Sequence, residues 1–278
     1  MLRHRPAFLP IVALALATPL AAAHPPAPAY GGLLTDYAYA ELADLALAAP
    51  IVLAADIDRA TALKPDAAPG LGAGRTRYFV EASVRGLIGG RAAVPATIRY
   101  LVDLPLANAK LKATPVLLFA SLSDKPGEIR LVSPRAQVPR TPENEARVRA
   151  ILTASVAPDA PPAITGIARA FHVAGSLPGE GETQIFLRTA DARPISLSGL
   201  RRPGETPRWA VALTELVDDS AAPPKPDSFL WYHLACGLPR ALPDAAVAGL
   251  EGGDATQART DYRVVLDGLG PCNRAHAG

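Results

Sequence analysis

The chain has few of the residues that metal centres and catalytic sites most often use: its 278 residues include two cysteines, five histidines and one methionine. Two cysteines exclude a disulfide-dense scaffold. The sequence contains no G-x-S-x-G, H-E-x-x-H, C-x-x-C-H or Walker A motif. The glycine-rich residues 70–74, GLGAG, lack the Lys-Ser/Thr end of a phosphate-binding loop and precede a strand-like segment, so we interpret them as a hairpin tip. We therefore expect no cofactor, and enzymatic activity is the less favoured interpretation.

Long apolar runs are also scarce, and the one exception stands at the N-terminus. Arg3 and Arg5 precede the apolar residues 7–20, and a small-x-small pattern ends at Ala23. This arrangement is typical of a secretory signal peptide, which we assign to residues 1–23. An uncleaved anchor or a buried helix is the alternative, disfavoured because the stretch is short, contains Pro10 and Pro19, and directly follows Pro6. We expect a periplasmic or secreted protein that is not inserted in the membrane after signal cleavage.

The chain has no strong excess of either charge. It carries 28 Lys and Arg against 26 Asp and Glu, and removal of Arg3 and Arg5 with the signal peptide leaves 26 of each. A neutral exported protein has no global field that attracts polyanions. We therefore expect no nucleic-acid partner.

What the chain does contain is strand-like alternation interrupted by proline and glycine. A proline-rich linker at 24–35 precedes a helix that Thr35 or Asp36 is expected to cap and that runs to about Ala48. Glycine- and proline-containing turns separate the strand-like runs that follow. Within residues 36–140 these runs are 51–60, 75–85, 96–103, 116–120 and 129–132. One helix and five short strands predict a small curled or barrel-like sheet.

The second half repeats this composition without repeating the sequence. Thr141 and Pro142 form a typical helix start, and the predicted helix and its linker occupy residues 141–162. A second β lobe is predicted over 163–217, followed at 218–278 by a linker and C-terminal helices. Its strand-like runs are 164–173, 182–190, 194–200 and 208–217, and the helices are 228–238 and 258–269. The predicted fold is mainly β (α+β), with two small β lobes, flanking helices and a C-terminal helical segment.

Two resemblances accompany these patterns. In strand number and spacing, residues 36–135 resemble the oligonucleotide/oligosaccharide-binding (OB) barrel, including its exported netrin-like relatives; an SH3-like barrel or a β-sandwich would give a similar pattern. The segments GEGETQIFLRTAD, PRWAVAL and SFLWYHLACGLPRALP resemble a family of exported proteobacterial proteins of unknown function. The second resemblance implies export and a shared fold over most of the mature chain, and it implies no activity and no site residue.

The two cysteines suggest either a disulfide or a metal site. Cys236 and Cys272 stand near the ends of the two C-terminal helices, and an even pair in an oxidising compartment predicts a disulfide. With His233 and His276 the same residues have zinc-like local spacing. Export and the position of His276 close to the chain end favour the disulfide and no metal. We interpret His172, inside a predicted strand, as structural.

A binding surface is predicted on the outward side of two neighbouring strand-like runs. Cations and apolar groups alternate there: Arg75, Arg77, Phe79, Arg85, Arg99 and Leu101. Barrels of the resembling type bind extended ligands on this face. In the alternative, the apolar pair packs under a helix or the second lobe and the arginines are a solvated rim. The predicted function is an exported non-catalytic binding or envelope-associated protein with a protein or anionic glycan partner; a periplasmic hydrolase of unknown substrate is the alternative.

Overall fold

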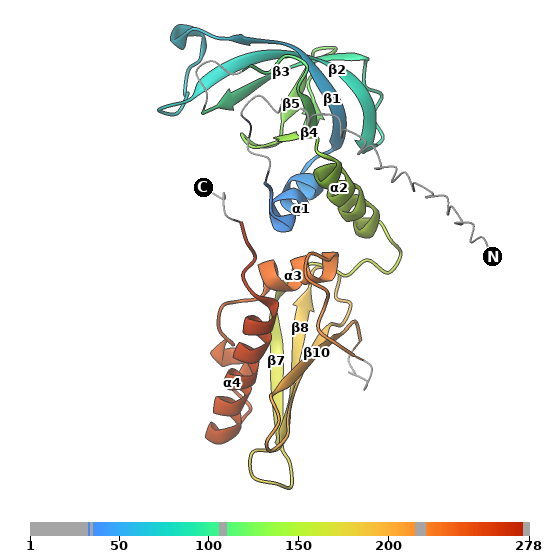
Figure 1. Cartoon of the computed structure of the whole chain (residues 1–278). Coiled ribbons are helices and arrows are strands. Elements are labelled where there is room, and N and C mark those ends of the chain that lie inside the picture. Colours follow the sequence, from blue (N-terminus) through green and yellow to red (C-terminus); the bar gives the residue numbers. More distant parts are fainter. Residues whose placement is uncertain (1–32, 34–35, 106–109, 215–220, 275–278) are drawn as a thin grey trace, which may run out of the picture.

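The structure consists of two antiparallel sheets separated by helices. The computed structural model describes residues 33, 36–105, 110–214 and 221–274, so the predicted signal peptide at 1–23 lies outside the described residues. Two sheets and four α-helices are present in this part of the chain, which confirms a mainly β fold with flanking helices. In Figure 1 the curled first sheet lies above two helices, and the second sheet lies below them.

The first sheet has six strands in the order β3-β2-β1-β4-β5, and β6 also pairs with β4. The strands are β1 (Ile51–Ala62), β2 (Thr76–Gly89), β3 (Thr97–Leu104), β4 (Pro115–Leu122), β5 (Ile129–Leu131) and β6 (Gln137–Pro139). Each of the five predicted strand-like runs coincides with one of these strands. Strand β6 was not predicted, because three residues are too few to show the alternation of buried and exposed side chains that marks a strand.

The first sheet curls without closing into a barrel. Its two edges, β3 and β5, meet at a single parallel bridge between Arg99 and Glu128, with no continuous ladder between them. The barrel form of the predicted curled or barrel-like sheet is therefore not confirmed. The predicted alternation holds within the curl, because Tyr78, Val80 and Ala82 of β2 are buried on its inner face while their neighbours in sequence are not.

Two helices cover the outer side of β1 and β4. Helix α1 (Tyr39–Ala48) begins three residues after Asp36, where the carboxylate of Glu41 accepts a hydrogen bond of 3.0 Å from the backbone N–H of Ala38. The predicted cap at Asp36 was therefore wrong, and Thr35 lies outside the described residues. Helix α2 (Pro142–Ser155) starts as predicted, since the Thr141 hydroxyl accepts a 3.0 Å hydrogen bond from the N–H of Asn144.

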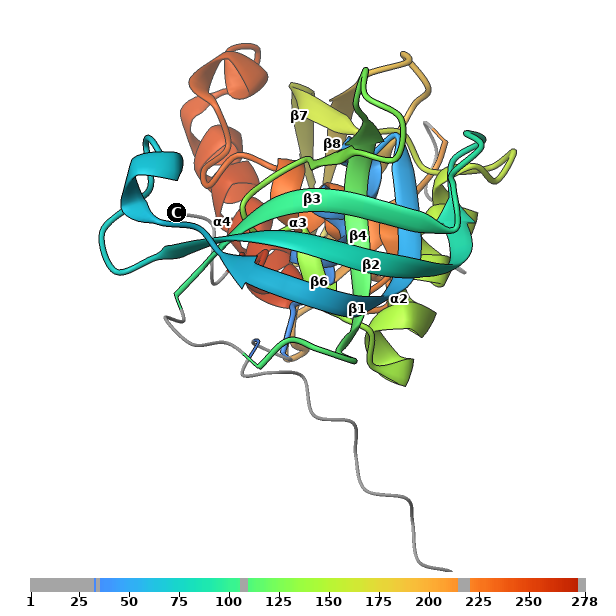
Figure 2. The same ribbon diagram turned by 90° about the horizontal axis from the view of Figure 1, so that it is seen from above.

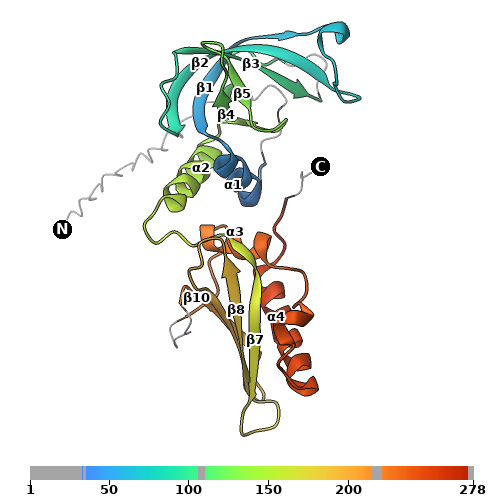
Figure 3. The same ribbon diagram turned by 180° about the vertical axis from the view of Figure 1, so that it is seen from behind.

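The second sheet is a four-stranded meander in the order β10-β9-β8-β7. Its strands are β7 (Ile164–Ala174), β8 (Gly181–Thr189), β9 (Ser196–Arg201) and β10 (Arg208–Ala212). The fourth predicted run extended to residue 217; β10 ends at Ala212, and residues 215–217 lie outside the described part. Figure 3 shows helix α4 (Gly252–Leu269) alongside this sheet and α3 (Phe229–Gly237) at its end.

The C-terminal helices differ from the prediction in extent. Helix α3 matches it, with the Ser228 hydroxyl accepting a hydrogen bond from the N–H of Trp231. Helix α4 begins at Gly252, six residues before the predicted start. The earlier start was not predicted because the first turns of the helix carry no apolar stripe. Two short 3-10 helices, η1 (Pro65–Ala67) and η2 (Asp244–Val247), were not predicted. No helix in the described ranges is long and apolar enough to cross a membrane.

Buried apolar side chains form two clusters. One fills the inside of the curled first sheet and includes Leu53, Val80 and Leu118. The other is continuous from the outer side of that sheet, at Phe119, through helices α1 to α4 to the second sheet, at Leu197. The helical layer therefore buries apolar surface from both sheets at once.

Candidate ligand-binding groove

A groove of about 700 Å³ lies where the two edges of the first sheet separate. One wall is formed by β2 and β3, and the other by the segment 123–134, which contains β5. We call this feature the β3–β5 groove. In Figure 2 no helix lies in front of β2 and β3. Leu101 of β3 lines the groove and is 50% exposed, so the groove is accessible to solvent at this strand.

Four of the six residues on the predicted face line this groove: Arg77, Phe79, Arg99 and Leu101. Arg75 does not, and its side chain donates to the carbonyl of Asp103. Arg85 also lies outside the groove. It lies eight residues further along β2 than Arg77, which is about 26 Å at the rise of a strand, and its guanidinium pairs with Asp56 at 2.7 Å. The predicted face is thus divided between the groove and a separate ion pair at the other end of the strand.

Arg77 is held by the protein and does not present a free charge. Its Nε and Nη2 donate to the two carboxylate oxygens of Asp103 at 2.7 and 2.8 Å, and its Nη1 donates to the carbonyl of Pro69 at 3.1 Å. The hydrogen bonds from Arg77 lower the pKa of the Asp103 carboxyl below its ordinary value. This bidentate pair forms part of the groove wall.

Three further cations in the groove have no carboxylate partner among the described residues. They are Arg99 on β3, Lys125 in the turn before β5, and Arg130 on β5. Among the described residues, the guanidinium of Arg99 donates to one group, the carbonyl of Pro126, at 3.3 Å. The groove also contains the carboxylate of Glu128. Because Asp103 is paired with Arg77, the other charged residues of the lining carry more positive than negative charge.

Lys125 and Arg130 were missed at the sequence level. They lie in a turn and in the strand-like run 129–132, more than 20 residues from β3 along the chain, and no binding residue was predicted there. Only the curl of the sheet brings this segment beside β3. The resemblance to an OB barrel was the one sequence signal that implied such an approach.

Two apolar side chains lie beside these cations. Phe79 and Leu101 are paired across β2 and β3, and both point to the outer side of the sheet. Leu101 is 50% exposed, and neither residue belongs to either buried cluster. The exposure of Leu101 does not fit the alternative in which a helix or the second lobe covers this pair. Cationic and apolar groups therefore stand together on an accessible surface.

A buried hydrogen bond supports the wall of the groove from inside the curl. The hydroxyl of Tyr100 donates to the side-chain oxygen of Gln137 at 2.7 Å, and both residues are buried. Burial raises the pKa of Tyr100 above its ordinary value. The phenol therefore stays protonated and serves as a hydrogen-bond donor.

A second polar cluster lies between the second sheet and α4. The carboxylate of Asp261 accepts hydrogen bonds from the hydroxyl of Thr183 at 2.5 Å, from Gln257 at 3.0 Å, and from Arg201. Because the single hydroxyl proton of Thr183 goes to Asp261, Nδ1 of His172, 2.9 Å from that hydroxyl, must carry the proton of their hydrogen bond. His172 is thus a satisfied structural residue, as interpreted from the sequence.

This cluster offers no reachable nucleophile. Thr183 is fully buried and Asp261 is 2% exposed. A hydrolytic site requires a nucleophile or a bound water that substrate can approach. The cluster instead joins α4 to the sheet through buried, charge-assisted hydrogen bonds.

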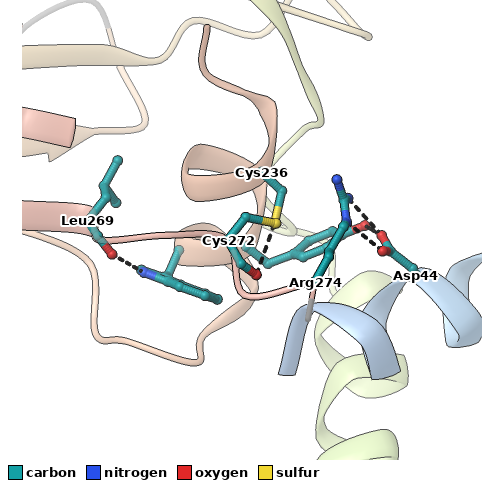
Figure 4. Close-up of a disulfide and its surroundings, with 7 residues drawn as sticks. Asp44, Cys236, Leu269, Cys272 and Arg274 are labelled. Atoms are coloured by element: carbon teal, nitrogen blue, oxygen red, sulfur yellow. Dashed lines mark hydrogen bonds and ion pairs between the residues drawn. A yellow bond between two sulfur atoms is a disulfide. The ribbon is translucent and has the colours of Figure 1, made fainter. Parts of the chain in front are cut away.

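The predicted disulfide is present. Cys236 and Cys272 are bonded, with Cα atoms 5.0 Å apart, and no cysteine is free. Figure 4 shows the bond joining the end of α3 to the segment after α4. Both sulfurs of the alternative zinc set are therefore occupied, and His276 lies outside the described residues. The His233 ring packs against Phe229, with centroids 4.5 Å apart, and burial lowers its pKa.

The disulfide stands beside a contact between the C-terminal segment and α1. Arg274, two residues after Cys272, donates to both carboxylate oxygens of Asp44 at 2.6 and 2.9 Å, and the hydroxyl of Tyr232 donates to the same carboxylate at 2.7 Å (Figure 4). Trp231 donates its indole N–H to the carbonyl of Leu269 at 2.8 Å. The bonds to Asp44 connect the end of the second lobe to helix α1, which covers the first sheet, and the Trp231 bond joins α3 to α4.

In the described ranges, no group of three or more His, Cys, Asp or Glu side chains is placed to hold a metal ion. The chain matches no protein-family model and no curated protein.

Proposed function

We propose that this chain is an exported, non-catalytic binding protein that takes an extended anionic ligand in the β3–β5 groove. The observation that carries the proposal is the set of three cations, Arg99, Lys125 and Arg130, that line one open groove without a carboxylate partner among the described residues. Half-buried Phe79 and exposed Leu101 beside them supply apolar contact. Charge gives attraction and orientation, and the apolar pair gives buried area on binding.

The proposed location is the periplasm or the outside of the cell, reached through a signal peptide at residues 1–23. The Cys236–Cys272 disulfide supports this location, because structural disulfides form and persist in oxidising compartments. The partner is proposed to be a protein or an anionic glycan of the cell envelope.

The first sheet is proposed to be an incompletely closed barrel of the OB type. Its order, β3-β2-β1-β4-β5, and the parallel bridge between β3 and β5 support this assignment. OB folds are partly open Greek-key barrels that bind extended polymers on the face of their second and third strands. The β3–β5 groove includes residues of that face.

Binding of a fluorescein-labelled, fully sulfated hexasaccharide, followed by anisotropy at low salt, tests the proposal. Arg99→Ala and Arg130→Ala should each weaken binding about fivefold to tenfold, because each removes a charge-assisted contact worth roughly 1 kcal/mol or more. Arg85→Ala is the matched control, since Arg85 is an exposed β2 arginine outside the groove. The proposal fails if neither groove variant weakens binding more than the control does.

A further inference from the structure

The outer edge of β3 has backbone groups with no hydrogen-bond partner among the described residues. The N–H of Arg99 donates to the carbonyl of Gly127 at 2.8 Å, so the backbone of Arg99 faces away from β2. Alternate residues of a strand present their N–H and C=O groups to the same edge. Leu101 and Asp103 therefore face this edge too. Past the single bridge no strand of the described chain pairs with it, and only the Asp103 carbonyl has a partner, Nη1 of Arg75.

The facing edge of β5 is free in the same way. The N–H of Val132 donates to Phe119 of β4, and the carbonyl of Glu128 accepts from Ser123 after β4, so even-numbered residues of this segment face β4. The backbone of Leu131 consequently faces the groove. Two strand edges thus begin in contact at Arg99 and Glu128 and diverge beyond that bridge, with the groove between them.

We propose that the ligand of the β3–β5 groove is an extended acidic peptide segment of another protein, which adds to the sheet as a strand along β3. The inference rests on the proposed function and names its ligand class. A peptide strand alternates donors and acceptors at the same interval as the free groups of Leu101 and Asp103, so it continues the ladder; a sugar chain has no such repeat.

The side chains of the groove determine the peptide's composition. Arg99 and Arg130 both point to the outer face of the curl, whereas their strand neighbours Tyr100 and Ile129 are buried. A peptide strand that lies between them presents alternate side chains to the same two faces. Acidic residues at every second position therefore meet the cations, and the intervening apolar residues turn toward the interior of the curl.

The test uses octapeptides in which glutamate alternates with Val, Thr, Leu or Phe, together with versions that are N-methylated at alternate residues in either frame. With the full chain, the parent peptides should bind, and methylation in at least one frame should weaken binding tenfold or more, because it removes the ladder donors. Exchange of the Leu101 and Asp103 amide hydrogens, measured by NMR, should slow at least tenfold in the complex.

A protein variant provides a second, independent test of strand addition along β3. Leu101→Pro removes a donor that the protein does not use, at an edge where proline is tolerated. It should abolish peptide binding while the sulfated hexasaccharide still binds through the cations. Leu101→Val, which keeps the N–H, is its control, and circular dichroism with thermal unfolding establishes that both variants are folded.

The outcomes separate the two proposals. Binding of the hexasaccharide without any binding of the peptides, or equal binding of methylated and parent peptides, would overturn strand addition and leave the proposed function in place. Failure of both probes to bind in a manner sensitive to Arg99→Ala would overturn both proposals.

Discussion

Removal of the Cys236–Cys272 disulfide should lower the free energy of unfolding by about 4 kcal/mol. The bond closes a loop with a sequence separation of 36 residues. In the chain-entropy model a loop of this length restricts the unfolded chain by about 13 cal/mol/K, which is about 4 kcal/mol at 25 °C. The neighbouring Arg274–Asp44 ion pair is over a third exposed on both sides, so its loss would add at most about 1 kcal/mol.

The assay is urea unfolding of the Cys236→Ala/Cys272→Ala double variant, followed by circular dichroism. Alanine is preferred to serine because Cys272 is buried and a hydroxyl there would lack a partner. The midpoint should fall by about 1 M, since unfolding slopes in urea are about 1–3 kcal/mol/M or somewhat larger for a chain of this size. Dithiothreitol should shift the wild type to the same midpoint and leave the variant unchanged. A fall of less than 1 kcal/mol would show that the disulfide does not stabilise the fold by restricting the unfolded chain.

Three further changes address the second lobe. Asp261→Asn should destabilise the protein by about 3 kcal/mol, because it leaves Arg201 without its charged partner in a buried site; a loss under 1 kcal/mol in urea unfolding would contradict this. Gly181→Ala should cost about 2 kcal/mol, since the added methyl would lie 2.8 Å from Cε1 of His172, whereas Gly253→Ala at an open helical site should be neutral or stabilising. Because burial lowers the pKa of His233, the unfolded chain binds a proton first, and stability should fall as the pH drops below about 6.5; His233→Gln should flatten this part of the stability–pH profile.

Local patterns were sufficient to predict most elements of the fold. The alternation of β2 identified its buried face, and Thr141 with Pro142 identified the start of α2, because both signals lie within a few residues of the feature that they specify. The start of α4 and the existence of β6 were not predictable in this way. An apolar stripe is absent from the first turns of α4, and β6 forms only because β4 offers it an edge.

Of the two walls of the β3–β5 groove, only the one formed by β2 and β3 was predictable from the sequence. Alternation placed Phe79 and Leu101 on an outer face, but the partner of Arg77 depends on the register between β2 and β3, which joins it to a residue 26 positions away. Arg130 reaches the groove through the curl of the whole sheet. Such long-range pairing leaves no trace in sequence spacing, so the charge that remains free in the groove could not be assigned before the structure.

The most direct test of an anionic binding groove is a titration of the isotope-labelled full chain with the sulfated hexasaccharide, followed through backbone amide chemical shifts. Binding in the β3–β5 groove should change the amide chemical shifts mainly at residues 99–103 and 125–133 and leave those of β7 to β10 unchanged. No shifts at low salt, or shifts confined to the second sheet, would contradict it.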